Sequence, residues 1–311
     1  MHLAKLYSCG GDEMSENILN KKFLLSPFSI FDTIQGNWQE NKKKWLHMGV
    51  KSEIGRDATC LPTGFDESKY GKKISQGTSI FDPFLCEVLY TWFNVENGNI
   101  LDPYAGGSVR GIVAEKLGFK YTGIELSEKQ VLSNREQAKD IGVTPKWFIG
   151  DSNKKLDEAP NLHYDMLLTC PPYYNLEVYS DDKDDISNFK TYEEFLEVYS
   201  SIIKKGIEKV KVNRFIVYVV SNFRDNEGNI IDFVGDTIRL HKKHGVNLYN
   251  EIILANAIGT LPVRTSAIFP KTRKIGKRHQ NVLVFFKGDS KEIKNIYALL
   301  DIQGTKQKRL F

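Results

Sequence analysis

The chain has 311 residues, of which 41% are hydrophobic and 26% are charged, and its formal net charge is +4. This composition is typical of an ordinary globular protein. No run approaches about 18 apolar residues and the first residues lack an apolar core segment, so we expect neither a membrane span nor an export signal. Four cysteines without C-x-x-C spacing indicate neither a metal site nor a disulfide framework, and they favour a reducing cytoplasm: Cys9, Cys60, Cys86 and Cys170.

The N-terminal quarter of the chain shows little periodicity. Residues 1 to about 20 are polar and patternless, and residues 64–77 are rich in Gly, Ser and Lys, which is typical of a loop. Between them, two tryptophans and a leucine at helical spacing predict an amphipathic helix over 37–47, with its three lysines facing solvent. We therefore expect an N-terminal extension over 1–78, a main domain over 79–290 and a C-terminal tail over 291–311.

Strands and helices alternate from residue 79 onward. Asp82-Pro83 opens a helix over 84–93, because proline is favoured in the first turn. We treat residues 150–163 as a polar loop. Strands separated by helical runs predict an open α/β sheet with helices on both faces. The predicted strands are 99–102, 121–125, 146–149, 164–169, 215–221, 249–255 and 280–286, and the predicted helices between them are 110–117, 128–139, 192–210 and 234–244.

A glycine turn follows the first of these strands, in the sequence Asp102-Pro-Tyr-Ala-Gly-Gly-Ser108. Glycine permits a positive φ and the close approach of a ligand. The next two strands end at Glu125 and at Gly150-Asp151, so a glycine turn and two acids would meet at the carboxyl edge of the sheet, where nucleotide-like ligands bind. The alternative is a structural turn with incidental acids.

The nature of the ligand follows from the acid at the start of this turn. Asp102 would repel a phosphate group, whereas it could accept a hydrogen bond from an ammonium group such as that of S-adenosylmethionine. The turn also lacks the G-x-G-x-x-G pattern of nicotinamide dinucleotide sites. These features favour S-adenosylmethionine as the cofactor and make a nicotinamide dehydrogenase the least favoured interpretation.

A second motif ends the strand over 164–169, in the sequence Thr169-Cys-Pro-Pro-Tyr-Tyr174. Two prolines fix the backbone and leave carbonyl groups without competing N–H donors. An aromatic ring follows at once, so this end of the strand could hold a flat base by its edge and by its face. Packing of two aromatic residues into the core is the alternative.

Together the two motifs resemble those of the DNA amino-methyltransferases. That family carries Asp-Pro-Phe-Ala-Gly-Ser-Gly in its cofactor motif and Asp, Asn or Ser before Pro-Pro-Tyr in its catalytic motif. The order of the two motifs resembles the gamma or alpha arrangement. The resemblance extends over about 79–287, and residues 25–57 and 276–288 resemble phage-borne members.

The resemblance implies a Rossmann-like class I methyltransferase fold. This is a doubly wound, mostly parallel seven-stranded sheet with an antiparallel last strand. It also implies direct methyl transfer to the exocyclic amino group of adenine (N6) or cytosine (N4), with the target base flipped out of double-stranded DNA in a bacterial or phage-infected cell. No membrane is involved, and a homodimer is compatible with the sequence. The extension over 1–78 would contact DNA.

Site residues carry over from the family by position. Catalytic residues would be Cys170, Pro171, Pro172 and Tyr173, with the amino group donating to residue 170 and to the Pro171 carbonyl and the Tyr173 ring stacking on the base. Cofactor-binding residues would be Phe81, Asp82, Asp102, Tyr104, Ala105, Gly106, Gly107, Ser108, Glu125, Leu126, Asp151 and Ser152.

Cys170 departs from the family pattern, because a thiol accepts hydrogen bonds less well than a carboxylate, amide or hydroxyl group. Cysteine is nearly isosteric with serine, and the family's cytosine-N4 enzymes carry Ser-Pro-Pro-Tyr. This similarity slightly favours cytosine as the target. The thiol also leaves open methylation of pyrimidine C5 with Cys170 as the nucleophile, although a Glu-containing partner motif is missing. An RNA base methyltransferase and a non-catalytic nucleic-acid-binding module are further alternatives.

Cations that could hold nucleic acid gather before the last predicted strand, in a Gly-containing segment. A solvated loop is the alternative interpretation. The acidic run over 181–185, directly after the catalytic motif, would repel phosphate and has no assigned role. Phe189, Tyr192, Asn222 and Arg224 are second-tier candidates for facing the pocket. The candidate nucleic-acid-binding cations are Arg264, Lys271, Arg273, Lys274, Lys277 and Arg278.

Overall fold

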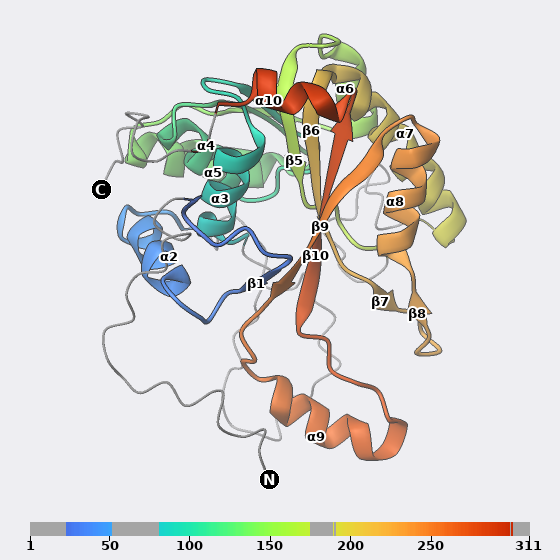
Figure 1. Ribbon diagram of the computed structural model, residues 1–311. Coiled ribbons are helices and arrows are strands. Elements are labelled where there is room, and N and C mark those ends of the chain that lie inside the picture. Colours follow the sequence, from blue (N-terminus) through green and yellow to red (C-terminus); the bar gives the residue numbers. More distant parts are fainter. Residues whose placement is uncertain (1–22, 52–80, 175–188, 190, 299, 301–311) are drawn as a thin grey trace. The chain divides into compact units, whose positions relative to one another are not determined.

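The structure is a computed structural model that describes residues 23–51, 81–174, 189, 191–298 and 300 (Figure 1). Residues 29–298 form one compact unit, and the chain before and after them forms another, which lies almost wholly outside the described residues. The predictions for residues 1 to about 20, 64–77 and 181–185 fall outside the described residues.

An eight-stranded sheet forms the centre of the larger unit within the described residues, in the order β1-β9-β10-β6-β5-β2-β3-β4. Neighbouring strands are parallel except for β10, which is antiparallel to both β6 and β9. The strands are β1 (Ile30–Asp32), β2 (Asn99–Asp102), β3 (Lys120–Glu125), β4 (Lys146–Ile149), β5 (Tyr164–Thr169), β6 (Val210–Val220), β9 (Asn247–Ala255) and β10 (His279–Lys287), and a separate hairpin pairs β7 (Phe223–Arg224) with β8 (Ile230–Ile231).

Helices cover both faces of this sheet. α2, α3, α4 and α5 lie on one side and α7 and α8 on the other, with α6 packed against α7 (Figure 1). The helices are α2 (Trp38–His47), α3 (Pro83–Phe93), α4 (Val109–Lys116), α5 (Glu128–Ile141), α6 (Ser152–Glu158), α7 (Tyr192–Lys209), α8 (Phe233–Lys243), α9 (Leu261–Thr272) and α10 (Ile293–Ile296), the last preceded by a 3-10 turn over Ser290–Glu292.

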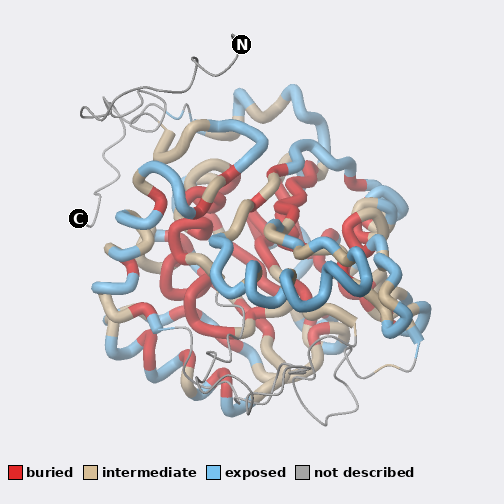
Figure 2. Tube along the Cα trace, turned by 90° about the horizontal axis from the view of Figure 1, so that it is seen from below, coloured by how far each residue is buried: buried red, intermediate tan, exposed pale blue. Residues whose placement is uncertain are grey.

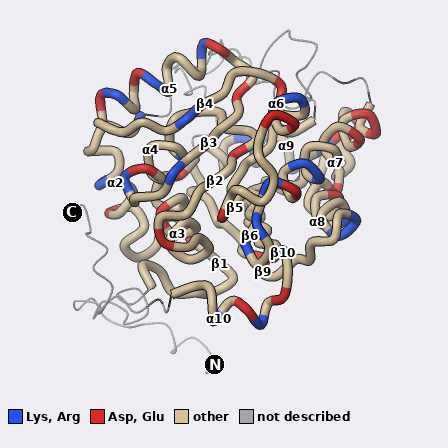
Figure 3. Tube along the Cα trace, turned by 90° about the horizontal axis from the view of Figure 1, so that it is seen from above, with Lys and Arg blue, Asp and Glu red and all other residues tan. Residues whose placement is uncertain are grey.

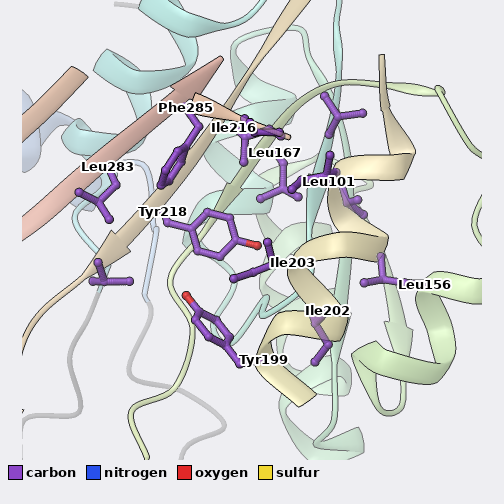
Figure 4. Packing of buried hydrophobic residues seen from close by; sticks show 14 of the residues in the cluster. Leu101, Leu156, Leu167, Tyr199, Ile202, Ile203, Ile216, Tyr218, Leu283 and Phe285 are labelled. Carbon is purple, nitrogen blue, oxygen red and sulfur yellow. The ribbon is translucent and has the colours of Figure 1, made fainter. Parts of the chain in front are cut away.

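One hydrophobic cluster of the core lies between the central strands and α7 (Figure 4), and buried apolar side chains of α3 and α4 belong to the other face of the sheet. Every residue of β5 is buried, as expected for a parallel strand covered on both faces. α7 places Phe195, Tyr199, Ile202 and Ile203 on one face, at the spacing of an amphipathic helix, and its first turn is closed by a capping box.

The predicted fold class is confirmed, with one strand added. Without β1, the sheet order corresponds to the class I methyltransferase order, and the last strand is antiparallel as expected. The eighth strand comes from residues 30–32, which pair with β9, and Trp38 of α2 contacts Phe84 of α3 edge to face. Residues 29–51 of the expected N-terminal extension therefore belong to the same unit as the main domain.

Several elements differ from the sequence-based prediction. The expected polar loop over 150–163 contains α6, whose burial is limited to Ser152 and Leu156, so the apolar pattern is too sparse to mark a helix. α9 was not predicted because none of its residues is buried. β6 begins five residues before the predicted strand, in a stretch that alternates polar and apolar side chains.

No helix within the described ranges combines the length and the apolar character that a membrane crossing requires.

Candidate active site

The carboxyl ends of β2 and β5 meet at Asp102, which is fully buried. One carboxylate oxygen, Oδ1, accepts from the Thr169 hydroxyl group at 2.6 Å and from the Tyr104 N–H at 3.2 Å. The other, Oδ2, accepts from Arg110 Nε at 2.6 Å and from the Tyr121 hydroxyl group at 2.7 Å. Asp102 thus ties together the cofactor motif and the residue before Cys170.

Arg110 neutralises this carboxylate from the first turn of α4. Its NH2 group also donates to the carbonyl groups of Tyr104 and Ala105, so the guanidinium lies beneath the glycine turn. Burial disfavours the charged form, but Asp102, Tyr121 and Cys170 outweigh it and raise the pKa of Arg110 above its ordinary value. Asp102 is therefore less available to an ammonium ligand than the sequence indicated, because its charge is already balanced by a buried arginine.

The glycine turn is held against β3 by Glu125. Gly106 has a φ of +52°, and its N–H donates to Glu125 Oε2 at 2.8 Å. The other carboxylate oxygen of Glu125 accepts from the Ser127 N–H at 2.8 Å. A Cβ on Gly123 would lie 2.8 Å from the Ala105 Cβ, so this strand must carry glycine for the turn to approach. The predicted meeting of Glu125 with the glycine turn is thus present in the structure.

A polar face of α5 supports the same turn from behind, and the sequence analysis missed it. Asn134 Nδ2 donates to the Gly106 carbonyl group at 2.7 Å, and Gln130 Nε2 donates to Asn134 Oδ1 at 2.8 Å. Gln137 Oε1 accepts from the Ser108 hydroxyl group at 3.1 Å. These amides recur at i, i+4 and i+7 and are buried, so the spacing was visible although the polar character suggested a solvent-facing stripe.

The residues that follow β4, 150–152, contact the residues that follow β2. Asp151 is the N-cap of α6 and accepts from the Asn153 N–H at 2.8 Å. The buried Ser152 hydroxyl group donates to the Pro103 carbonyl group. Gly150 has a φ of +137° and donates its N–H to the Glu125 carbonyl group at 3.0 Å. The predicted acids Glu125 and Asp151 therefore belong to adjacent strand ends.

The remaining predicted cofactor residues differ in exposure. Ala105, Gly107 and Ser108 are buried, whereas Tyr104, Gly106, Glu125 and Leu126 are partly exposed. Burial raises the pKa of the Tyr104 hydroxyl group well above its ordinary value. The partly exposed members are the ones that a ligand can reach.

Phe81 and Asp82 lie at the start of α3. Asp82 is the N-cap of this helix, and it also accepts from Trp38 Nε1 at 3.1 Å and pairs with Lys42 at 3.0 Å. The Arg110 guanidinium lies over the Phe81 ring at 4.6 Å. Phe81 thus reaches the underside of the glycine turn, while Asp82 is engaged with α2.

The catalytic motif begins directly after β5. Cys170, Pro172 and Tyr173 are partly exposed and Pro171 is buried. Cys170 is close enough to Arg110 to contribute to its pKa. The Tyr173 ring meets Phe223 and Phe233 edge to face, with centroid distances of 6.0 and 5.9 Å, and Gln280 Nε2 lies 3.5 Å from its hydroxyl oxygen. Tyr173 is therefore a partly exposed ring positioned by a cluster of aromatic residues.

The second-tier candidates have structural partners. Tyr192 donates its hydroxyl group to Asp236 at 2.8 Å, Asn222 Oδ1 accepts from the Val234 N–H at 2.8 Å, and Arg224 donates to the Gly228 carbonyl group at 2.7 Å. Phe189 packs against the core cluster. These contacts fix the β7–β8 hairpin and the start of α8 beside the catalytic motif.

The predicted cations lie on the segment that links β9 to β10. Because β9 is parallel to β6 and β10 is antiparallel to both, this link leaves from the same edge of the sheet as Cys170 and the glycine turn. The segment has no acidic residue between Glu251 and Asp289. Acidic and basic residues are by contrast interspersed over the helices seen in Figure 3.

Sequence comparison identifies no relative of this chain: no protein-family model matches it and no curated protein matches it. Comparison with solved structures does find similar folds. TrmN from Thermus thermophilus shares 14% sequence identity over 66% of this chain and 48% of its own, with a TM-score of 0.45. This chain thus matches about half the length of TrmN.

Two further structures are also similar in fold. Precorrin-6y C5,15-methyltransferase from Geobacter metallireducens shares 15% identity over 67% of this chain and 90% of its own, with a TM-score of 0.43. The [4+2]-cyclase SpnF shares 12% identity over 67% of this chain and 81% of its own, with a TM-score of 0.47. These are likenesses of fold alone. The strand order and the antiparallel last strand establish that the chain has the Rossmann-like class I methyltransferase fold.

Proposed function

We propose that this protein is an S-adenosylmethionine-dependent methyltransferase that acts on the exocyclic amino group of adenine or cytosine in double-stranded DNA. The observation that carries the proposal is the hydrogen bond between Thr169 and Asp102. It joins the Cys170-Pro-Pro-Tyr173 motif to the glycine turn at adjacent strand ends. A base amino group at the first motif and a methyl donor at the second would then lie side by side.

The residues at the strand ends fit S-adenosylmethionine. Glu125 is partly exposed at the end of β3, as a carboxylate that binds ribose hydroxyl groups must be. Gly106 takes a positive φ, and its neighbours lie directly on β3. When bound, the cofactor supplies an electrophilic methyl group. Glu125 would hold its ribose, Gly106 its methionine part and Asp151 its adenine edge.

At the base end, the chain offers acceptors and an aromatic ring. The Cys170 and Pro171 groups follow β5 directly, and proline supplies no N–H that would compete for their acceptors. Tyr173 is held by two phenylalanine rings and would stack on a base removed from the duplex. These groups orient the amino nitrogen, so catalysis comes from positioning rather than from a covalent intermediate.

Labelled methyl transfer to duplex DNA tests the role of Tyr173. We expect Tyr173→Ala to lower transfer by at least about 100-fold, since both stacking and orientation are lost, while S-adenosylmethionine affinity changes little. Tyr173→Phe keeps the ring and removes the hydroxyl group that contacts Gln280, so it should retain most activity. Full activity in Tyr173→Ala would refute the proposed base site.

A second variant separates the proposed chemistry from methylation at pyrimidine C5. Cys170→Ser should remain active if residue 170 only accepts a hydrogen bond from the amino group, because the hydroxyl group is the better acceptor. If the Cys170 thiolate instead attacks the pyrimidine ring as a nucleophile, Cys170→Ser should be inactive. Competition between DNA and RNA of the same sequence for the labelled methyl group decides the substrate class.

A further inference from the structure

The cations between β9 and β10 are not equivalent. α9 and the segment after it form an arm, here defined as residues 256–278, and Figure 2 shows the exposed helix of this arm in pale blue across the front of the molecule. A hollow of about 280 Å³ lies at the base of the arm. Its polar lining comprises Ser221, Asn256, Arg264, Lys277, Arg278 and His279. The arm thus directs three of its six cations into one concave site.

Two of these cations have no acidic partner among the described residues. Lys277 Nζ donates to the Asn222 carbonyl group at 3.1 Å, and Arg264 has no ion pair in the part of the chain that the structure describes. Arg278 is different, because its guanidinium donates to the Asn256 carbonyl group at 2.8 Å and lies 3.6 Å from Asp32. Partial burial lowers the pKa of Lys277. A hollow whose two cations lack an acidic partner within the described ranges suits an anion.

The hollow lies at the same edge of the sheet as the catalytic motif, and two of its lining residues are close in sequence to residues that contact Tyr173. His279, which lines it, precedes Gln280, whose amide contacts the Tyr173 hydroxyl group. Ser221, which donates to the His279 carbonyl group at 3.4 Å, lies two residues before Phe223, whose ring meets the Tyr173 ring edge to face. A group bound in the hollow would therefore lie beside any base stacked on Tyr173.

We propose that this hollow binds the backbone phosphodiester next to the nucleotide whose base enters the active site, with Lys277 and Arg264 as its ligands. The proposal rests on the proposed function, since it takes nucleic acid as the substrate. A nucleotide joins its base and its phosphate through one sugar, so the two contacts would fix the flipped nucleotide at both ends. The distal cations Lys271 and Arg273 have no part in this site.

A single neutral linkage in the substrate tests the assignment. Once the methylated base is mapped, duplexes are made with one methylphosphonate on either side of it. We expect kcat/KM of the wild-type protein to fall roughly 10- to 100-fold at one of these linkages, because a charge-assisted contact is lost. In Lys277→Gln, which keeps a donor for the Asn222 carbonyl group, the same replacement should cost almost nothing further.

Lys271→Gln is the matched control, because it removes the same charge from the same arm about two turns of α9 away from Arg264. On the methylphosphonate duplex, the kcat/KM of Lys271→Gln should fall by the same factor as that of the wild-type protein. Unchanged S-adenosylmethionine affinity in each variant verifies folding. If both variants lose activity equally on the modified duplex, the hollow is not the phosphate site although the proposed function stands. If the wild-type protein methylates no nucleic acid, both proposals fall.

Discussion

Arg110 holds the glycine turn from below, with its guanidinium between a buried carboxylate and two carbonyl groups. Its side chain is 5% exposed and that of Asp102 is fully buried. A buried pair of this kind is costly to break from one side, since the remaining charge has no compensation. The pair therefore fixes the strand end from which both motifs are built.

Removal of this arginine should destabilise the fold strongly. We expect Arg110→Leu to lower the free energy of unfolding by about 3–5 kcal/mol in urea denaturation. Adding Asp102→Asn should recover part of this loss, because the uncompensated charge is removed. Arg239→Leu is the control. Its exposed side chain pairs with Asp236 at 2.7 Å and with Asp232 at 3.4 Å, and its loss should cost under about 1 kcal/mol. Equal effects at the two arginines would contradict this account.

We expect His241 to make the free energy of unfolding depend on pH. It is buried on α8 and stacked on Phe285 at 3.8 Å, and burial lowers its pKa from 6.5 to about 3. Below about pH 6.5 the unfolded chain binds a proton that the folded chain does not take up until about pH 3. The free energy of unfolding should therefore fall as the pH falls through this window, by up to about 1.4 kcal/mol per pH unit.

Urea denaturation at pH 7, 5.5 and 4.5 isolates this contribution. His241→Gln removes the titrating group and should be less stable at pH 7, yet its stability should decline less steeply toward pH 4.5. The partly exposed His244 serves as the comparison, and His244→Gln should follow the wild-type slope more closely. Parallel pH profiles for His241→Gln and the wild-type protein would contradict the assignment.

At the scale of elements, the sequence identifies those that bury an apolar pattern. β4 and β5 have the predicted bounds, and α7 differs from prediction by one residue. β5 is a continuous buried run, and the buried side chains of α7 recur at helical spacing. α9 buries nothing and α6 very little, so neither has a pattern to detect. The sequence pattern also does not show which side chains pair within the core. Asp102 was therefore expected to face the ligand, whereas it pairs with Arg110 of α4.

The site shows the same limit. The meeting of Glu125 with the glycine turn could be predicted, because carboxyl ends of parallel strands share one edge. The contacts of the α5 amides with the glycine turn could not be predicted, since a polar stripe on a helix usually faces solvent. Asn134 instead hydrogen-bonds the carbonyl group of Gly106. Sequence periodicity locates a face of a helix, but only the structure shows what covers it.

The arm over 256–278 should be separable from the fold. Because β9 and β10 pair up to Ala255 and His279, a short Asn-Gly turn can replace residues 258–276. We expect this variant to keep its thermal stability, since α9 buries no residue, and to keep its S-adenosylmethionine affinity. Its affinity for duplex DNA in fluorescence anisotropy should fall by roughly tenfold or more, with a shallower salt dependence. Unchanged DNA affinity would show that the arm does not bind nucleic acid.

At the scale of the whole molecule, the fold and the chemistry rest on different observations. The strand order establishes the class I methyltransferase fold. A fold of this kind does not by itself determine the reaction, so the chemistry must be argued from the site. Here Thr169, the residue before Cys170, donates its hydroxyl group to Asp102 at 2.6 Å and accepts from the Tyr104 N–H at 3.2 Å. These two hydrogen bonds link motifs from distant parts of the chain.

The central claim is tested most directly by mass spectrometry of nucleosides from duplex DNA that has been incubated with the purified protein and isotopically labelled S-adenosylmethionine. The account predicts labelled N6-methyladenine or N4-methylcytosine. Labelled 5-methylcytosine, label confined to RNA in a parallel reaction, or no transfer by protein that binds the cofactor would contradict it.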